Sequence, residues 1–342
     1  MNPIDFVKMN KNRALYECMW GSAAFNFPVQ KTADSNNSYT FANTSAVDEG
    51  ICQNELANVF NIKRRNMFKQ KFTQSISGDG KELQRIATVH SSSLCALLFF
   101  YNVSEDNPYV MEIEGEEYIF TYSCFEYQNT VIKGRRQSNI DVVLIGKNKS
   151  TEKQTVLFLE SKFSEYYLDT GKKSHNGIAV AYLNNKYGAS LYGKDSLEKM
   201  ELSIEKNKDG KSFFLCSEKD CYLDGIKQMI SHYIGVRNLC DDPSVKNDEV
   251  AKAVAAGAKV ILGEILFTKG IGALSIGSGE KCLLSYQKKY RALAEILNEQ
   301  LRTDGMGDKI TVLGDVLSYS QFRDKDFIKE PLIKMFYFEF GK

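Results

Sequence analysis

Two short apolar runs with a charged residue inside them constrain the fold of this chain most. Ile140–Gly146 and Thr155–Leu159 are rich in Val, Ile, Leu and Phe, and the polar stretch Lys147–Gln154 separates them. Runs of this length, bounded by turn-forming residues, predict two buried β-strands joined by a hairpin. Asp141 lies inside the first run, where a charge is costly unless another group pairs with it.

Two more charged residues, Glu160 and Lys162, close the second run. Side chains alternate along a strand, so these two point to one face, and the hairpin brings Asp141 beside them. Two adjacent carboxylates repel each other, and one takes a proton unless a cation lies between them. Mg²⁺ prefers oxygen ligands and binds through one or two carboxylates plus phosphates. The pattern predicts a metal site; a surface ion pair at a strand end is the alternative, but it would not require Asp141.

The order of Asp, hairpin and Glu-x-Lys resembles the PD-(D/E)XK nuclease superfamily, whose members have a restriction-endonuclease-like fold. The matching residues are Asp141, Glu160 and Lys162. The proline that often precedes the aspartate is absent, and Ile140 stands in its place. The wider stretch 134–167 is also similar to a group of uncharacterised prokaryotic restriction-endonuclease-like proteins.

The resemblance implies an α/β fold with a restriction-endonuclease-like core, in which helices flank a mixed central β-sheet. The predicted order of helix, strand meander, helix, strand, helix and strand suits this architecture. We expect residues 1–80 to form an N-terminal helical extension and residues 81–342 to form the nuclease core.

The resemblance also implies an activity, namely Mg²⁺-dependent hydrolysis of DNA phosphodiester bonds by a restriction-type endonuclease, with Mn²⁺ able to substitute. Asp141 and Glu160 would bind the metal together with the backbone carbonyl of Ser161, as in the related enzymes, and Lys162 would orient a water or stabilise transition-state charge. Cutting both strands at one site favours a homodimer. The alternative is a catalytically inactive nuclease-fold protein that binds nucleic acid or a protein partner.

A third acidic residue is expected near the metal, and two candidates are open. If the polar segment 128–136 leads through a hairpin, Glu126 lies opposite Asp141 on the same face of the sheet. A register change of one residue would put it on the other face. Glu82 is the rival, because related nucleases often supply a glutamate from the helix before the sheet. We prefer Glu126.

DNA contacts must come from local basic patches, because the formal net charge is only +1. Arg135 and Arg136, just before the Asp141 strand, are the predicted backbone contacts, together with the basic cluster at 63–71. Each such cluster is more often a solvated surface than a phosphate contact.

A predicted helix after the catalytic strands, 223–236, carries Gln228 and His232 four residues apart, on one helix face. Related exonuclease-type members carry a Gln-x-x-x-Tyr motif on the equivalent helix, and here His232 occupies the tyrosine position. We expect Gln228 to contact the substrate or to be an ordinary surface residue.

The other expected elements follow from apolar periodicity and turn residues. Residues 82–100 predict one helix that includes the serines at 91–93. Glu264 lies within the buried strand 259–267, and we expect it near a strand end or a cleft. Residues 168–215 predict a loop-and-helix excursion. The remaining predictions are helices at 47–64 and 286–301, and strands at 109–114, 118–127, 310–317 and 331–340.

Composition and termini indicate where the protein works. Its eight cysteines are scattered along a long chain, and the N-terminus lacks the apolar core of a secretory signal. No apolar run reaches membrane-spanning length. The sequence therefore predicts free thiols in a cytoplasmic protein with no membrane contact.

Overall fold

The structure is a computed structural model. It describes residues 30–31, 39–40, 48–78, 82–88, 91–132, 136–163, 178–179, 198–206, 212–216, 223–268, 279–322, 327–334 and 337.

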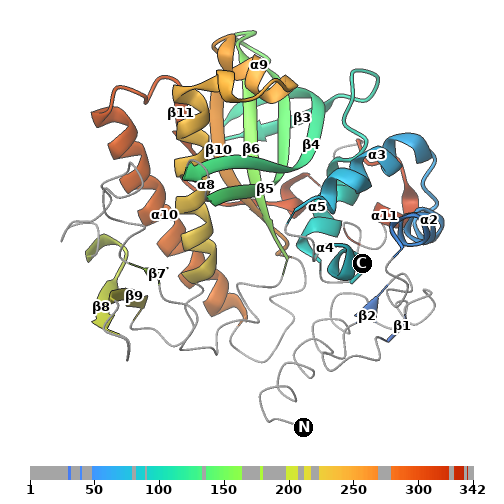
Figure 1. The fold of residues 1–342 in the computed structure, drawn as a ribbon, viewed down its shortest axis with the longest axis horizontal. Coiled ribbons are helices and arrows are strands. Elements are labelled where there is room, and N and C mark those ends of the chain that lie inside the picture. Colours follow the sequence, from blue (N-terminus) through green and yellow to red (C-terminus); the bar gives the residue numbers. More distant parts are fainter. Residues whose placement is uncertain are drawn as a thin grey trace.

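A curled, mixed seven-stranded sheet forms the centre of the molecule (Figure 1). Its strand order is β11-β10-β6-β5-β4-β3, and β12 pairs with β10 beyond β11. The strands from β3 to β6 are antiparallel, whereas β10 runs parallel to β6, β11 and β12. Their bounds are β3 Tyr109–Ile113, β4 Glu116–Ile132, β5 Arg136–Asn148, β6 Gln154–Lys162, β10 Lys259–Leu266, β11 Ile310–Val312 and β12 Leu317–Ser318.

The hairpin between β5 and β6 is the one that the two apolar runs predict. The Asn148 side chain accepts hydrogen bonds from the backbone N–H groups of Ser150 and Thr151, which fixes the turn. On β5, Gly146 packs so closely against β4 that an added Cβ would lie 2.0 Å from the Ile119 carbonyl oxygen. Only glycine permits this approach of the two strands.

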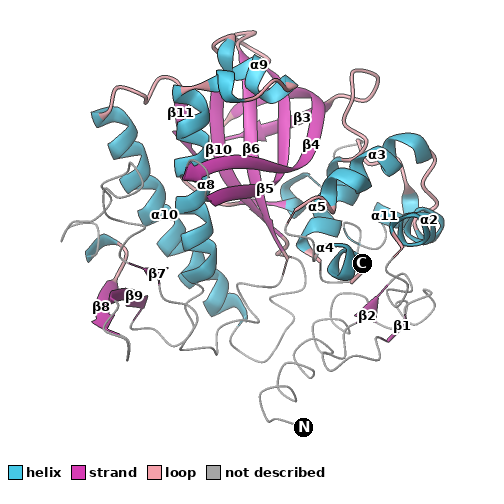
Figure 2. Cartoon of the chain, viewed as in Figure 1, coloured by secondary structure: helices cyan, strands magenta, loops and turns pink. Residues whose placement is uncertain are grey.

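Helices cover both faces of the sheet (Figure 2). Adjacent residues of β6 demonstrate the two layers, because their side chains point in opposite directions. Glu160 reaches His232 of α8 (Leu223–Asp241), whereas the Ser161 hydroxyl donates to the backbone carbonyl of Ser92 at the start of α5 (Ser92–Phe100). Helices α9 (Glu249–Ala255) and α10 (Gly279–Thr303) contact α8, and α3 (Arg65–Ser75) contacts α5 and β4.

Helices α2 (Glu49–Val59) and α3 precede the sheet, within the part of the chain predicted to be an N-terminal helical extension. Asp48 caps α2, because its side chain accepts a hydrogen bond from the Ile51 N–H. Within the predicted helix 47–64, only α2 is helical, and α3 starts at Arg65 as a separate helix. The division of the chain after residue 80 stays a prediction.

The predicted single helix at 82–100 is wrong: the structure has two helices, α4 (Glu82–Ile86) and α5. The Ser91 side chain accepts a hydrogen bond from the Leu94 N–H at 3.1 Å, so this serine caps the start of α5. Serine competes for backbone groups in a helix interior and is favoured at an N-cap.

Further differences lie toward the C-terminal half. Within the predicted edge strand 331–340, residues Pro331–Ile333 instead form the short helix α11, with proline at the first helical position, where its missing N–H costs nothing. The segment 168–215 contributes a small sheet in the order β7-β9-β8. The strands are β7 Ile178–Ala179, β8 Leu202–Lys206 and β9 Ser212–Cys216; the other described elements are β1 Gln30–Lys31, β2 Tyr39–Thr40 and the 3₁₀ turns Pro243–Val245 and Tyr319–Phe322.

No helix in the described ranges has the length and apolar character needed to cross a bilayer.

Candidate active site

Strands β5 and β6 separate at the point where the predicted acids lie. Their last paired residues at this end are Val142 and Leu159, so Asp141 and Glu160 come directly after the ladder opens. The backbone N–H of Ser161 donates to Oδ2 of Asp141 at 2.7 Å. A carboxylate thus takes the place of a strand carbonyl and holds the two strand ends together.

Glu160 and Lys162 lie on the α8 side of the sheet and are almost fully buried, with 3% and 4% of their surfaces exposed. The Lys162 ammonium lies 2.5 Å from Oε1 of Glu160. Nε2 of His232 lies 2.9 Å from Oε2 of Glu160, and Nδ1 of His232 contacts the Ser138 hydroxyl. The Nε2–Oε2 contact is not aligned as a hydrogen bond. Glu160 is therefore held between two cationic or polar side chains.

The two carboxyl groups have opposite pKa shifts. Burial raises the pKa of Glu160, but Lys162 and His232 outweigh burial and lower it to about 2. Burial raises the pKa of Asp141 well above its ordinary value, and the charges of Glu160 and Glu126 raise it further. Lys162 and the Ser161 N–H offset only part of this increase. Asp141 is thus the carboxyl group of the two that holds a proton more readily.

Glu126 on β4 lies opposite Asp141 on the neighbouring strand β5. The flanking pairs are Phe125 with Val142 and Tyr127 with Ile140, which leaves Glu126 opposite Asp141. Its backbone φ is +48°, in the left-handed region that side chains rarely adopt. Such strain is typical of functional positions.

This conformation reverses the alternation of β4. The Ser123 hydroxyl donates to the Phe100 carbonyl on the α5 face. Tyr127, four residues later, would share that face in a regular strand, yet its hydroxyl donates to Asp248 at the start of α9. The face of Glu126 therefore cannot be predicted from register alone.

The rival third acid, Glu82, reaches the same corner. A Cβ added to Gly78 would lie 2.9 Å from Oε2 of Glu126, 3.0 Å from Cδ of Glu82 and 3.2 Å from Nδ2 of Asn139. Both candidate acids therefore border one glycine. Their alternative roles stay predictions.

A family model described as "Restriction Endonuclease associating with ARP" (REase-ARP) matches residues 28–239, more than half of the chain. The chain belongs to the REase-ARP family. It therefore has a restriction-endonuclease-like fold, as the mixed sheet flanked by helices indicates. Neither the curated proteins nor the solved structures gave a match. The matched REase-ARP region contains the four candidate acids Glu82, Glu126, Asp141 and Glu160, together with Lys162 and His232.

Glu264, outside the matched REase-ARP region, extends the row of acids by one strand. It pairs with Glu160 across the parallel ladder of β10 and β6 and is completely buried. The Tyr286 hydroxyl donates to its Oε2 at 2.5 Å. We expected Glu264 near a strand end or a cleft; it lies two residues before the end of β10, beside Glu160. Sequence alone carries no signal for this register between distant strands.

Sequence reasoning missed the place of His232 in this candidate site. Its spacing of four from Gln228 was the available signal, but it pointed to Gln228. In the structure Gln228 is exposed on α8, whereas His232 is buried against Glu160. Arg135 lies outside the described residues, and so does the side chain of Arg136, so their roles stay predictions.

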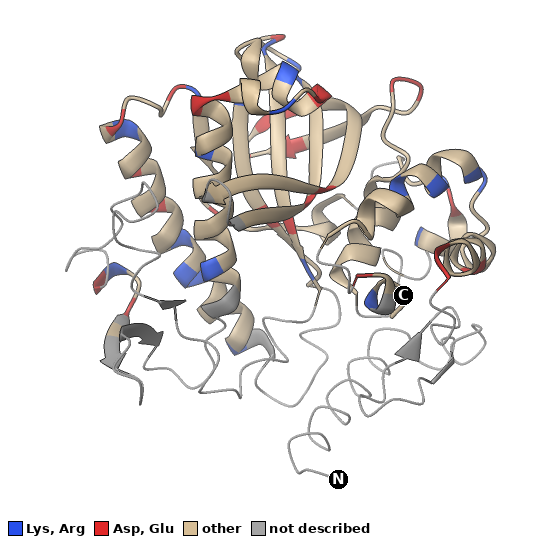
Figure 3. Ribbon diagram, viewed as in Figure 1, with Lys and Arg blue, Asp and Glu red and all other residues tan. Residues whose placement is uncertain are grey.

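The charge of this site suits a divalent cation, but the described side chains do not form a complete set of metal ligands. In the described part of the chain, no three His, Cys, Asp or Glu side chains are grouped so that they could hold a metal together. Mg²⁺ commonly takes only one or two protein carboxylates and completes its shell with water and phosphate. Glu126 and Glu160 raise the pKa of Asp141 through their negative charges. A bound cation would offset this repulsion. Figure 3 shows acidic stretches on central strands that otherwise carry few charges.

Proposed function

We propose that this REase-ARP protein is a metal-dependent deoxyribonuclease of the PD-(D/E)XK type that hydrolyses DNA phosphodiester bonds. The single observation that carries the proposal is the meeting of Asp141, Glu160 and Lys162 where β5 and β6 separate. The family description, a restriction endonuclease, supports DNA as the substrate and a restriction-type endonuclease as the activity.

Asp141 and Glu160 are the proposed metal ligands, with the backbone carbonyl of Ser161 and a carboxylate of Glu126 or Glu82. Mg²⁺, or Mn²⁺ in its place, would polarise the scissile phosphate and lower the pKa of a bound water. Glu160 now contacts Lys162 and His232, so binding a metal through it requires a change in at least one of these contacts.

Lys162 supplies positive charge where the phosphate becomes more negative in the transition state. Its ammonium is buried at 4% exposure, and in a site shielded from water a fixed charge stabilises a developing anion more strongly than in solvent. His232 would act as a positioning residue, because it contacts Glu160 and is itself contacted by Ser138. Arg135, Arg136 and Gln228 remain the proposed substrate contacts.

Nuclease assays on the full-length chain test this proposal. We expect cleavage of linear, circular or single-stranded DNA with Mg²⁺ or Mn²⁺ and none with a chelator. Asp141→Asn and Lys162→Met should each reduce the cleavage rate by a factor of about 10²–10³, the range for removal of a transition-state group. Glu117→Gln, at an exposed β4 carboxylate paired with Lys149, is the matched control and should retain activity. Full activity of either site variant would refute the assignment.

Binding without cleavage is the second candidate outcome, favoured by the engagement of Glu160 with Lys162 and His232. An inactive nuclease-fold protein would retain DNA in a gel-shift assay but show no metal-dependent cleavage of any DNA form. Cleavage of both strands at one site is expected from a homodimer. Sedimentation of the protein with and without DNA measures its oligomeric state.

A further inference from the structure

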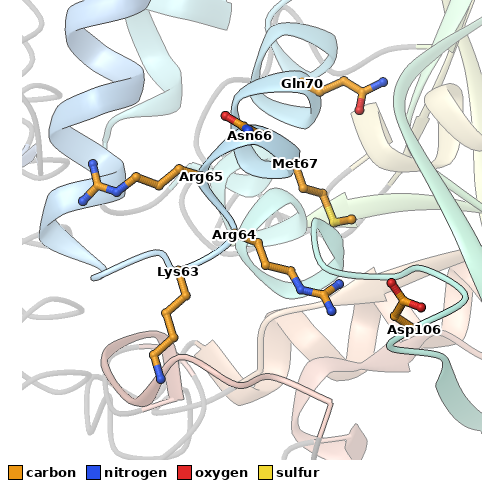
Figure 4. A pocket seen from close by; sticks show the side chains of 7 residues that line it. All are labelled: Lys63, Arg64, Arg65, Asn66, Met67, Gln70 and Asp106. Carbon is orange, nitrogen blue, oxygen red and sulfur yellow. The ribbon is translucent and has the colours of Figure 1, made fainter.

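An open basic concavity lies at the start of α3, away from the catalytic acids (Figure 4). Lys63, Arg64 and Arg65 contribute three consecutive cations to it, and Asn66 and Gln70 of α3 add polar side chains. Cationic and amide side chains in one hollow are the groups that proteins use to contact phosphate and sugar.

Two of the three cations are held in place by neighbouring elements. Nη1 of Arg64 donates to the Ser104 hydroxyl at 3.1 Å, and Nη2 of Arg65 donates to Oδ1 of Asn58 at 2.8 Å. Each guanidinium has five N–H donors, so one such bond leaves donors for a ligand. Arg64 points into the hollow between Met67 and Asp106 in Figure 4.

Two carboxylates oppose these cations. Asp106 lines the concavity, and the buried Glu330 lies behind it, where Glu330 and Arg64 act in opposite directions on the pKa of Tyr101. One lining carboxylate against three lining cations leaves the hollow positive.

The backbone of α3 adds to this attraction. Arg64 stands at the N-cap without a side-chain cap, and the first turn has no acidic residue. Helix α2 differs, because Asp48 caps it and Glu49 lies in its first turn. Unpaired N–H groups and the positive end of the dipole favour an anion at such a helix start.

We propose that this concavity binds a backbone phosphate of the DNA at a distance from the cleaved bond. The inference rests on the proposed nuclease function. Helix α3 has 11 residues and so is about 16 Å long. Its far end leads to Gly78, which borders Glu126 at the catalytic site. For a duplex whose axis runs along α3, a rise of 3.4 Å per base pair puts the bound phosphate about five base pairs from the scissile phosphate.

Binding measurements with three variants test the pocket. The full-length chain is titrated with a labelled duplex in chelator over a salt series, so that cleavage does not intervene. Lys63→Gln and Arg65→Gln should each weaken binding to all sequences and reduce the slope of log affinity against log salt by about 1. Lys153→Gln removes the same charge from an exposed site in the turn between β5 and β6 that does not line the hollow, and it should leave the slope unchanged. Equal slopes for Lys63→Gln and Lys153→Gln would overturn the proposal.

A second measurement locates the phosphate and identifies its source. Single neutral methylphosphonate substitutions along one strand should weaken wild-type binding at a position about five base pairs from the cut, and this effect should vanish in Lys63→Gln. Inorganic phosphate that competes as well as DNA at equal phosphate concentration would indicate a free-phosphate site instead. Failure of the nuclease proposal is seen separately, as absent cleavage by wild type whatever the salt slopes are.

Discussion

The ionised form of Asp141 destabilises the fold. Its half-buried side chain lies near two other carboxylates, and desolvation and their charges raise its pKa well above the ordinary value. A raised pKa in the folded state means that the ionised form is disfavoured on folding. The contribution of Asp141 to stability is therefore fully present below its unfolded pKa and is lost as pH rises through its folded pKa.

Asp141→Asn should accordingly stabilise the fold while abolishing cleavage. The amide keeps an oxygen that can accept from the Ser161 N–H but carries no charge beside Glu160 and Glu126. We expect the free energy of unfolding at neutral pH to rise by about 1 kcal/mol, and the gain to shrink below about pH 4, where an unfolded aspartate is itself protonated. Urea unfolding at several pH values measures this. A variant less stable than wild type at neutral pH would contradict it.

The pKa of Glu160 shifts in the opposite direction from that of Asp141. Its pKa is lowered from the model-compound value of 4.5 to about 2, so its stabilisation is present above pH 4.5 and is lost as pH falls toward 2. Glu160→Gln removes the partner of the buried Lys162 and should cost about 2–4 kcal/mol at neutral pH. The cost should disappear in acid. A difference between variant and wild type that does not depend on pH would show that packing, not charge, is responsible.

At the scale of elements, α8 delivers His232 to the site through a close approach to β4. A Cβ added to Gly235 would lie 2.7 Å from Cβ of Asn129. The side-chain amide of Asn238 on α8 also donates to the Thr130 carbonyl at 2.8 Å. The position of His232 beside Glu160 therefore depends on a glycine one turn further along the helix.

Gly235→Ala should push α8 away from β4 and destabilise the fold by about 1–3 kcal/mol, the range for overpacking a close contact. Gly50→Ala is the matched control, since Gly50 is also helical but meets only the flexible side chain of Asp48, at 3.2 Å. Better helix propensity should offset that contact, so the control should change stability by less than about 1 kcal/mol. Thermal unfolding compares the two; equal effects would disprove the close packing of α8.

Helix α3 connects the basic concavity with the region around Glu126. Its first turn borders the basic concavity, and the residues after its end border Glu126. Lys71 in its middle donates to the Ser123 carbonyl of β4, which ties the helix to the sheet. A rigid helix between the two places sets the spacing that the methylphosphonate experiment measures.

At the scale of the whole molecule, an ion that binds only the folded state must stabilise it. We expect Mg²⁺ to raise the melting temperature, with a gain of about 2.7 kcal/mol at a free concentration one hundred times the dissociation constant. Asp141→Asn should show no such gain, whereas Glu117→Gln should behave as wild type. Calorimetry with Mg²⁺ and with chelator tests this. An equal Mg²⁺ effect in both variants would place the ion elsewhere.

The central strands and the positions of Asp141, Glu160 and Lys162 on them follow from local sequence. Apolar runs of strand length, a turn between them and side-chain alternation are properties of neighbouring residues, so β5 and β6 were predictable. The split between α4 and α5 was less so, because Ser91 can lie inside a helix or cap one, and only its hydrogen bond to Leu94 distinguishes these roles.

By itself, the sequence determined which acids and which lysine stand at the end of one hairpin, and it indicated a restriction-endonuclease-like fold. Only the tertiary structure decided what surrounds them: Glu126 with its own backbone in the left-handed region, Glu82 beside Gly78, His232 from α8 and Glu264 from β10. The physical reason is that hairpin contacts join residues close along the chain. Helix docking and parallel pairing instead join distant segments, and their register depends on the packing of the whole core.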